Sequence, residues 1–558
     1  MIERIRSISV EAALFGVLVL AGFVIRAGGL AGPLSPDESA RALGAWQLHR
    51  GSPVDWWDAP AFAVAQAAVF FLFHDSDAAA RLIPLLAGAG VIAALWLYRP
   101  WLGSLPVIIA AGLLAISPAA IETASRANET SLAALLTMLL GWALLRYWNE
   151  NKPSLMLWGG IGFGTLLNLG YPGVSGALVL AMFCAAYASF RSMHSLPLPS
   201  WFADYRPFGV ATLVTCILLS TGLFLFTPGL GVPSIAAWTQ HFEPSHFPTP
   251  WFLPWLLLAT SALPGLFVGL PGAFIALSNW FRRPMDVAGP ASAFFAIWGL
   301  SGAAFLLLSG DIPLASAVFW AGMPLTVCGA LLLGNGLQAV RSDFLQATWP
   351  NFATAGVLLT FALLTLLHNV QQPATGSFTS DAIAVLAVVA AALLLSPQAT
   401  TYYKPYALSA AGGLVVIVLA SIHLHGIPWP GTATTTPLAA SYVTQVTAFS
   451  PYTVEGRRQS IGVQPLLKPD LAWQLRSIPG VSYIDQPSPQ LTMIIAEESA
   501  GRLVSKEYQG PTLGVTETPS FQTWSAGEVL QWLLFSALPV DTATSDRMSV
   551  LKRTSGNR

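Results

Sequence analysis

The sequence predicts a mainly α-helical protein that crosses a membrane many times and carries a small α/β domain at its C-terminal end. Of the 558 residues, 54% are hydrophobic and only 9% are charged, whereas a soluble domain carries about 25% charged residues. Apolar runs long enough to span a bilayer, about 20 residues each, follow one another as far as residue 426. Beyond it, Thr, Ser, Pro and charged residues become frequent again, which indicates a soluble domain.

The apolar runs predict about thirteen transmembrane helices. The run at 59–73 is shorter and lies beside polar segments, which is typical of a helix lying along the membrane interface. The first run is followed by many more and by no small-residue cleavage site, so we interpret it as a retained helix. The predicted spans are 11–29, 79–98, 104–118, 130–148, 154–170, 173–190, 208–227, 251–280, 291–309, 313–336, 352–370, 381–396 and 407–424.

The composition divides the chain into a transmembrane domain, 1–426, a linker, 427–440, and an α/β domain, 441–558. Apolar alternation and helical spacing in the last part predict two helices and two strands. The helices are expected at 471–478 and 526–537, and the strands at 481–484 and 491–495.

The placement of basic residues predicts a cytoplasmic N-terminus in a plasma-membrane protein. With this orientation, the later outer loops contain no Lys or Arg, in line with the positive-inside rule. An odd number of spans then places the C-terminal domain outside the cell. The net charge of -1 argues against a nucleic-acid partner. Five basic residues nevertheless fall near the outer face, for which an anionic ligand is one explanation: Arg26, Arg41, Arg50, Arg81 and Arg126.

The first outer loop, 30–78, contains two adjacent acids, Asp37 and Glu38. Ser35 as N-cap, Pro36 at the first position and Glu38 three residues after Ser35 predict a helix start with a capping box. This structural interpretation accounts for Glu38. It explains Asp37 less well, because an acid in the first turn is favourable but not required.

The second outer loop carries Glu122, Arg126 and Glu129. If the segment is helical, the three side chains share one face. Two interpretations remain open: a structural ladder of ion pairs, or a charged functional site that faces the first loop. Charges close to a bilayer are expensive and often functional.

A further loop holds His241, Glu243 and His246, which are residue types that bind divalent metals. Their spacing is not that of a helical HExxH motif, and Pro244 interrupts any helix through the segment. A surface loop with scattered polar residues is the favoured interpretation.

At this point the residues resemble the GT-C glycosyltransferases, in the branch of protein O-mannosyltransferases and lipid A aminoarabinose transferases. The resemblance covers about residues 10–175 and depends on order and topology more than on any single motif. The matching pieces are Pro36-Asp37-Glu38, the stretch from Pro60 to Arg81, and residues 125–129 before the fourth span.

The resemblance implies a GT-C fold and a sugar donor linked to a polyprenyl phosphate, with transfer on the extracytoplasmic face. It implies that Asp37 acts as base or site organiser, with Glu38 and Glu129 as further catalytic candidates. Direct displacement would invert the anomeric carbon. The leaving phosphate needs cations, for which Arg81 and Arg126 are the first candidates and Arg41 the next. The acceptor stays open among a lipid, a glycan and a protein.

No cofactor is assigned, and a divalent metal ion is an open alternative, with Asp37, Glu129, His241, Glu243 and His246 as its candidate ligands. A transporter or flippase for lipid-linked sugars is the alternative function. Against it stand the scarcity of acids and bases in the middle of the later spans and the absence of internal repeats. A non-catalytic scaffold that displays the C-terminal domain explains the clustered outer charges least well.

Overall fold

The structure is a computed structural model of the whole chain. In the membrane region it describes residues 9–52, 58–150, 152–194, 205–224, 233–240, 258, 268–282, 289–308 and 314–344. In the C-terminal region it describes residues 434–435, 461–463, 473–476, 481–483, 491, 493–497, 508–509, 512–519 and 543–553. The spans predicted at 352–370, 381–396 and 407–424, and the helix predicted at 526–537, lie outside these residues.

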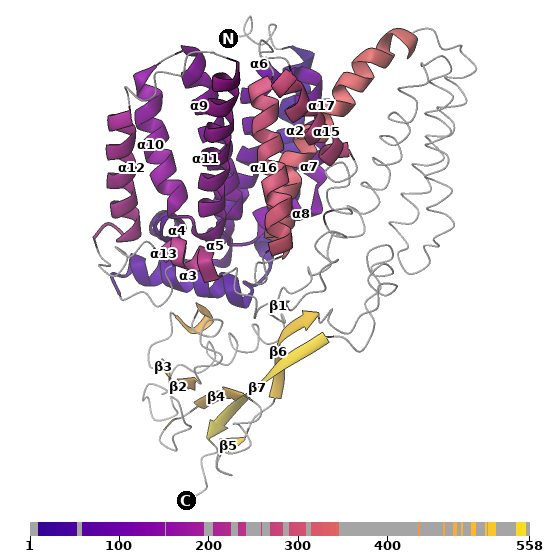
Figure 1. The fold of residues 1–558 in the computed structure, drawn as a ribbon. Coiled ribbons are helices and arrows are strands. Elements are labelled where there is room, and N and C mark those ends of the chain that lie inside the picture. Colours follow the sequence, from indigo (N-terminus) through magenta and orange to yellow (C-terminus); the bar gives the residue numbers. More distant parts are fainter. Residues whose placement is uncertain are drawn as a thin grey trace, which may run out of the picture.

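The described part of the membrane region is a bundle of helices (Figure 1). Its elements in chain order are α2 (Val10–Ala27), η1 (Gly28–Ala31), α3 (Pro36–His49), α4 (Pro60–Phe73), α5 (Asp77–Ala94), η2 (Leu95–Tyr98), α6 (Arg99–Leu102), α7 (Ser104–Ile116), α8 (Pro118–Ser125), α9 (Thr130–Glu150), α10 (Pro153–Leu167), α11 (Gly170–Met193), α12 (Tyr205–Ser220), α13 (Pro233–Gln240), α15 (Leu270–Arg282), α16 (Gly289–Leu308) and α17 (Leu314–Phe344).

Six helical segments among the described residues are long and apolar enough to cross a membrane. A seventh arises if α7 and α8, which meet at an angle of 62°, count as one broken span. The predicted spans at 154–170 and 208–227 appear as the shorter apolar helices α10 and α12. The six are Val10–Leu30, Asp77–Leu102, Thr130–Glu150, Gly170–Met193, Gly289–Leu306 and Ala315–Asn335, each at a predicted position.

Two helices lie across the end of the bundle that faces the described strands (Figure 1). These are α3 and α4, which come from the first outer loop. Helix α4 buries Phe62 and Phe70 and leaves Phe71 and Leu72 exposed. Its one polar side chain, Gln66, is buried, so α4 has no polar face, and the interfacial position expected for 59–73 stays a prediction.

The break between α7 and α8 explains one of the unexpected basic residues. Pro118 has no N–H to donate to the carbonyl oxygen four residues before it, which belongs to Leu114. Arg26 donates to that oxygen at 2.8 Å and to the carbonyl of Ala115 at 3.3 Å. The Arg26 side chain is 1% exposed, so its reason is structural and not the anionic ligand that the sequence suggests.

Replacing Arg26 by Met is expected to lower the free energy of unfolding by about 2–3 kcal/mol, because two buried carbonyls lose their donors. Denaturation of the purified protein in detergent measures the change. Arg50→Met, at an exposed position, is the matched control and should change little. Adding Pro118→Ala to Arg26→Met should recover part of the loss, and a stability of Arg26→Met equal to wild type would refute the explanation.

The described strands of the C-terminal region form one seven-stranded mixed sheet. Strand β2 (Ile461–Val463) pairs in parallel with β3 (Val481–Tyr483) and β4 (Met493–Glu497), and the other pairings are antiparallel. Strands β3 and β4 overlap the strands predicted at 481–484 and 491–495. Thr434–Thr435, in the range expected to be a linker, forms β1 and pairs with β6. The remaining strands are β5 (Tyr508–Gln509), β6 (Thr512–Pro519) and β7 (Ala543–Arg553).

Candidate active site

The start of α3 places two adjacent acids in opposite environments. The capping box predicted for Ser35 and Glu38 is present, with the backbone N–H of Ser35 donating to Glu38 Oε2 at 2.8 Å. Successive residues of a helix point about 100° apart. Glu38 is therefore buried, at 3% exposure, whereas Asp37 is exposed.

Glu38 and Arg81 form a buried bidentate ion pair. Arg81 Nε donates to Glu38 Oε1, and Nη2 donates to Oε2, both at 2.8 Å. The other N–H groups of Arg81 donate to the carbonyls of Gly29, Gly32 and Pro33 at distances from 2.6 to 3.1 Å. All five donors of this guanidinium are thus engaged.

The carboxylate of Glu38 is also fully engaged. Its Oε1 accepts a further hydrogen bond from the backbone N–H of Ala127 at 2.7 Å. Burial alone would raise the pKa of Glu38, but the hydrogen bonds and the charge of Arg81 hold it below its ordinary value. The pair therefore joins α3, α5 and the loop after α8. A catalytic role for Glu38 and a phosphate-binding role for Arg81 find no support in this geometry.

A second ion pair lies one helical turn further along α3. Arg41 Nε donates to Glu129 Oε2 at 3.1 Å, and the two side chains are 14% and 11% exposed. Burial would lower the pKa of Arg41, but the negative charges of Glu129, and then of Asp37, raise it. Glu38 and Asp58 add smaller effects in the same direction. Arg41 is thus a permanent cation between the acids of the two outer loops.

The second outer loop differs from its predicted form. Helix α8 ends at Ser125, and Arg126 has an extended backbone, so Glu129 does not share a helical face with Glu122. Arg126, just after α8, pairs with Glu122 of that helix, while Glu129 pairs with Arg41. The ladder interpretation therefore holds for the first pair only, and Glu129 joins the site on the first loop.

Asp37 differs from the other acids at this end of the bundle. Its side chain makes no hydrogen bond or ion pair within the described ranges, although its backbone carbonyl lies 3.5 Å from Arg41 Nη1. The acid that the sequence marks as the candidate base is thus exposed and held one turn from the Arg41–Glu129 pair.

Two further features of the site were not predicted. Gly170 has a φ of +63°, and a Cβ added there would lie 3.4 Å from the carbonyl oxygen of Asp58 and 3.6 Å from Glu129 Oε1. The Ser234 hydroxyl donates to the Asp58 carbonyl at 3.0 Å and accepts from the Gly170 N–H at 3.2 Å. These contacts bring the starts of α4 and α11 close to Glu129. Of these residues, only Gly170 could have been recognised from the sequence, because glycine is typical of positions with a positive φ.

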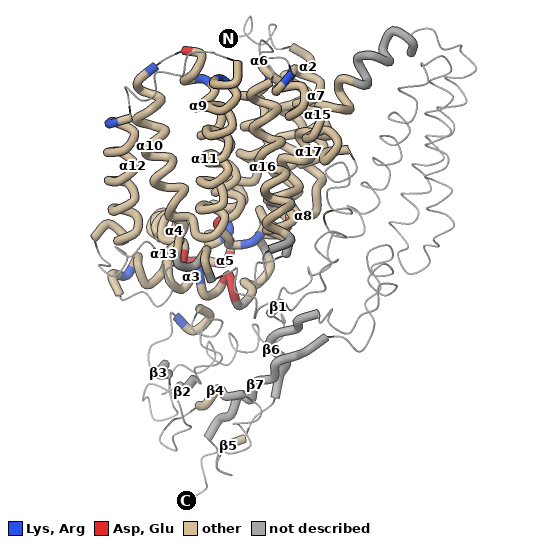
Figure 2. Tube along the Cα trace, in the orientation of Figure 1, with Lys and Arg blue, Asp and Glu red and all other residues tan. Residues whose placement is uncertain are grey.

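Charged residues lie at the two ends of the bundle (Figure 2). Within the ranges that the structure describes, no three His, Cys, Asp or Glu side chains lie close enough together to hold a metal ion. Asp37 and Glu129 therefore lack a third described ligand, and His241, Glu243 and His246 lie outside the described residues.

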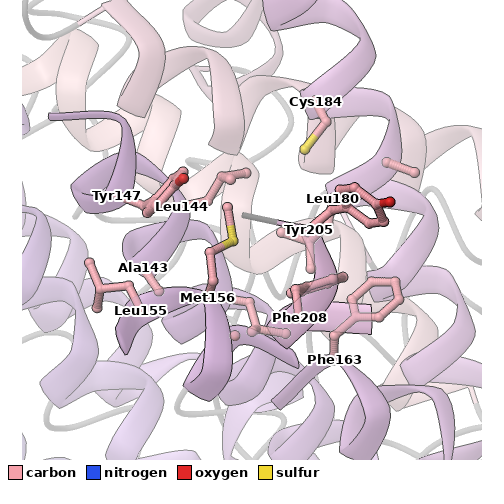
Figure 3. A pocket seen from close by; sticks show the side chains of 13 residues that line it. Ala143, Leu144, Tyr147, Leu155, Met156, Phe163, Leu180, Cys184, Tyr205 and Phe208 are labelled. Carbon is pink, nitrogen blue, oxygen red and sulfur yellow. The ribbon is translucent and has the colours of Figure 1, made fainter. Parts of the chain in front are cut away.

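An apolar cavity of about 240 Å³ lies between α9, α10, α11 and α12 (Figure 3). Tyr147, Met156, Cys184 and Tyr205 are among the residues that line it. Tyr147 and Cys184 come from the later turns of α9 and α11, and Met156 and Tyr205 from the first turns of α10 and α12, whereas Glu129 precedes the first turn of α9. No Asp, Glu, Lys, Arg or His contributes to the lining, so the cavity carries no charged side chain.

Residues 58–224 match the family model of dolichyl-phosphate-mannose-protein mannosyltransferases. No curated protein matches the sequence. The structure of ArnT from Cupriavidus metallidurans bound to undecaprenyl phosphate is similar, with a TM-score of 0.56, 16% identity, and coverage of 97% of this chain and 98% of that one. The same protein in the apo state gives a TM-score of 0.54 at 14% identity with the same coverage.

Identities this low show the shared fold alone. The fold match extends over nearly the whole chain, and the family match covers the segment that supplies Asp58, Arg81, Arg126 and Glu129. The chain thus has a GT-C fold and, as its sequence predicts, resembles the GT-C superfamily of membrane glycosyltransferases in its mannosyltransferase and ArnT branch.

Proposed function

We propose that the protein is a membrane glycosyltransferase that moves a sugar from a polyprenyl-phosphate-linked donor to an acceptor on the extracytoplasmic face of the plasma membrane. The observation that carries this proposal is the environment of Asp37. Its exposed carboxylate lies beside a permanent cation, Arg41, on a helix that two ion pairs hold to the bundle. The solved ArnT structure, which contains undecaprenyl phosphate, supports the choice of donor.

Asp37 acts as the general base in this proposal. It takes the proton of the acceptor hydroxyl while that oxygen attacks the anomeric carbon of the donor sugar. The bond between the anomeric carbon and the phosphate oxygen breaks, and the phosphate leaves with the bonding electron pair. Attack opposite to the leaving group inverts the anomeric carbon. An exposed carboxylate suits this role, because an acceptor can reach it.

Arg41 and Arg126 stabilise the leaving phosphate, which gains negative charge as the bond breaks. Arg41 lies one turn from Asp37, and Glu129 orients its guanidinium. Arg126 is 21% exposed and pairs with Glu122. Arg41 belongs to the first outer loop and Arg126 to the second. Of the three arginines expected to bind the phosphate, the proposal keeps Arg41 and Arg126, because all five N–H groups of Arg81 already donate to Glu38 and to backbone carbonyls.

A transfer assay with the purified protein tests the proposal. Labelled sugars linked to a polyprenyl phosphate are supplied together with lipid extracts and peptides as acceptors, and the release of polyprenyl phosphate is measured. Release that requires an acceptor supports the proposal. A protein that releases nothing from any such donor, but moves the intact lipid across liposome membranes, is a flippase and not a transferase.

A further inference from the structure

A short helical turn of the C-terminal region contacts the start of α5. Trp473 Nε1 donates to Asp77 Oδ1 at 2.8 Å. Arg476 Nε donates to Asp75 Oδ2 at 2.9 Å, and its Nη2 donates to the Asp75 carbonyl at 2.7 Å. The Arg476 guanidinium also lies 3.6 Å from the centre of the Trp473 ring, within the range of a cation–π interaction.

These polar contacts surround a buried aromatic ring. Trp473 is only 1% exposed, and its ring centre lies 5.6 Å from that of Phe70. Burial alone would raise the pKa of Asp75, but the hydrogen bond from Arg476 holds it below its ordinary value. The indole N–H of Trp473 thus has an acceptor in Asp77, and its ring packs against Phe70.

The cluster around Trp473 contains the immediate neighbours of the candidate active-site residues. Apart from Phe70, the buried members from the membrane region are small or of medium size, and Trp46 and Val69 pack against the cluster. Ala42 follows Arg41, and Ala127 is the residue whose N–H donates to Glu38. The cluster consists of Leu34, Ala42, Ala45, Phe70, Ala79, Ala80, Ala127 and Trp473.

We propose that Trp473 and Arg476 are positioning residues, through which the C-terminal domain holds α3 in the arrangement that transfer requires. Close-packed interiors transmit the loss of a large side chain to their neighbours. The side of α3 that carries Ala42 and Ala45 packs in the Trp473 cluster, while Asp37 and Arg41 belong to the same helix. The inference rests on the proposed function, to which it assigns a role for the C-terminal domain.

The test uses full-length protein with Trp473→Ala and Trp473→Phe. Trp473→Ala is expected to lower kcat for transfer at least ten-fold, with a smaller change in KM for the donor, because α3 with Asp37 and Arg41 loses its fixed position while Arg126, which lies outside α3, stays in place. Trp473→Phe is expected to restore most of kcat, because the ring still packs on Phe70. Trp158→Ala, at a side chain that is 68% exposed, is the matched control and should behave as wild type.

Amide hydrogen exchange provides a readout that needs no substrate. In Trp473→Ala, exchange is expected to rise in α3 and at the start of α5 and to stay unchanged in α16 and α17. Unchanged exchange in α3, or an equal rise throughout the bundle, would overturn the inference. If wild type transfers no sugar, the proposed function fails, but the exchange result still decides whether the C-terminal turn holds α3.

A second variant keeps the inference testable if Trp473→Ala cannot be purified. Asp77→Asn weakens the bond from the indole N–H without opening a cavity. It is expected to raise exchange in α3 by less than Trp473→Ala would. Exchange at the wild-type level in both Asp77→Asn and Arg476→Met would show that the contact does not position the helix.

Discussion

Replacing Asp37 by Asn is expected to lower kcat for sugar transfer by a factor of about 10²–10⁴, the range that a positioned general base contributes. Asn has nearly the same shape as Asp but cannot take a proton from the acceptor at neutral pH. Because Asp37 is exposed, the variant should fold as wild type does. The measurement is kcat and KM with a labelled polyprenyl-phosphate sugar, together with thermal unfolding in detergent.

Two further variants test whether the loss of activity in Asp37→Asn comes from the missing carboxylate at this position. Asp37→Glu keeps a carboxylate and should retain more activity than Asp37→Asn. Glu150→Gln removes an exposed acid from an ion pair with Arg146, at the far end of α9 from Glu129, and should leave kcat unchanged. Full activity of a folded Asp37→Asn would rule out Asp37 as the base, whereas the transfer reaction itself would stand.

The parts of the site that the sequence predicts are those with local causes. A helix start at Ser35 is visible within four residues, because an N-cap, a proline at the first position and a capping-box glutamate act on one another directly. The exposure of Asp37 and the burial of Glu38 follow from the same helix once its inner face is known.

The parts that the sequence does not predict depend on distant partners. Glu38 and Arg81 are 43 positions apart, and Arg41 and Glu129 are 88 apart. Nothing in the local pattern indicates which outer arginine pairs with which acid, so Arg81 resembled a phosphate ligand. The same holds for Arg26, because the carbonyls to which it donates belong to a helix break about ninety positions later.

Replacing Arg81 by Met is expected to lower the free energy of unfolding by about 3–5 kcal/mol, the cost of leaving a buried charge unpaired. The matched control is Arg99→Met. Arg99 also pairs with a glutamate, Glu11, at 2.9 Å, but these side chains are 40% and 46% exposed. An exposed pair contributes at most about 1 kcal/mol, so the control should change stability far less.

A double-mutant cycle with Glu38→Leu separates the ion pair from the other bonds of Arg81. The two changes together should cost less than the sum of the single changes, because the charge left unpaired in each single variant is then absent. Part of the cost remains, since the carbonyls of Gly29, Gly32 and Pro33 still lose their donor. Additive costs would mean that the two residues stabilise the fold independently.

The pH dependence gives an independent check of the same pair. The pKa of Glu38 is lower in the folded protein than its ordinary value of 4.5, so the pair stabilises the fold fully above that value and progressively less as the pH falls through the folded pKa. Wild type should therefore lose stability on acidification below about pH 4.5 more steeply than the Arg81→Met/Glu38→Leu variant does. Equal slopes would mean that Arg81 does not hold Glu38 ionised. The attachment of α3 to α5 and to the loop after α8 would then need another explanation.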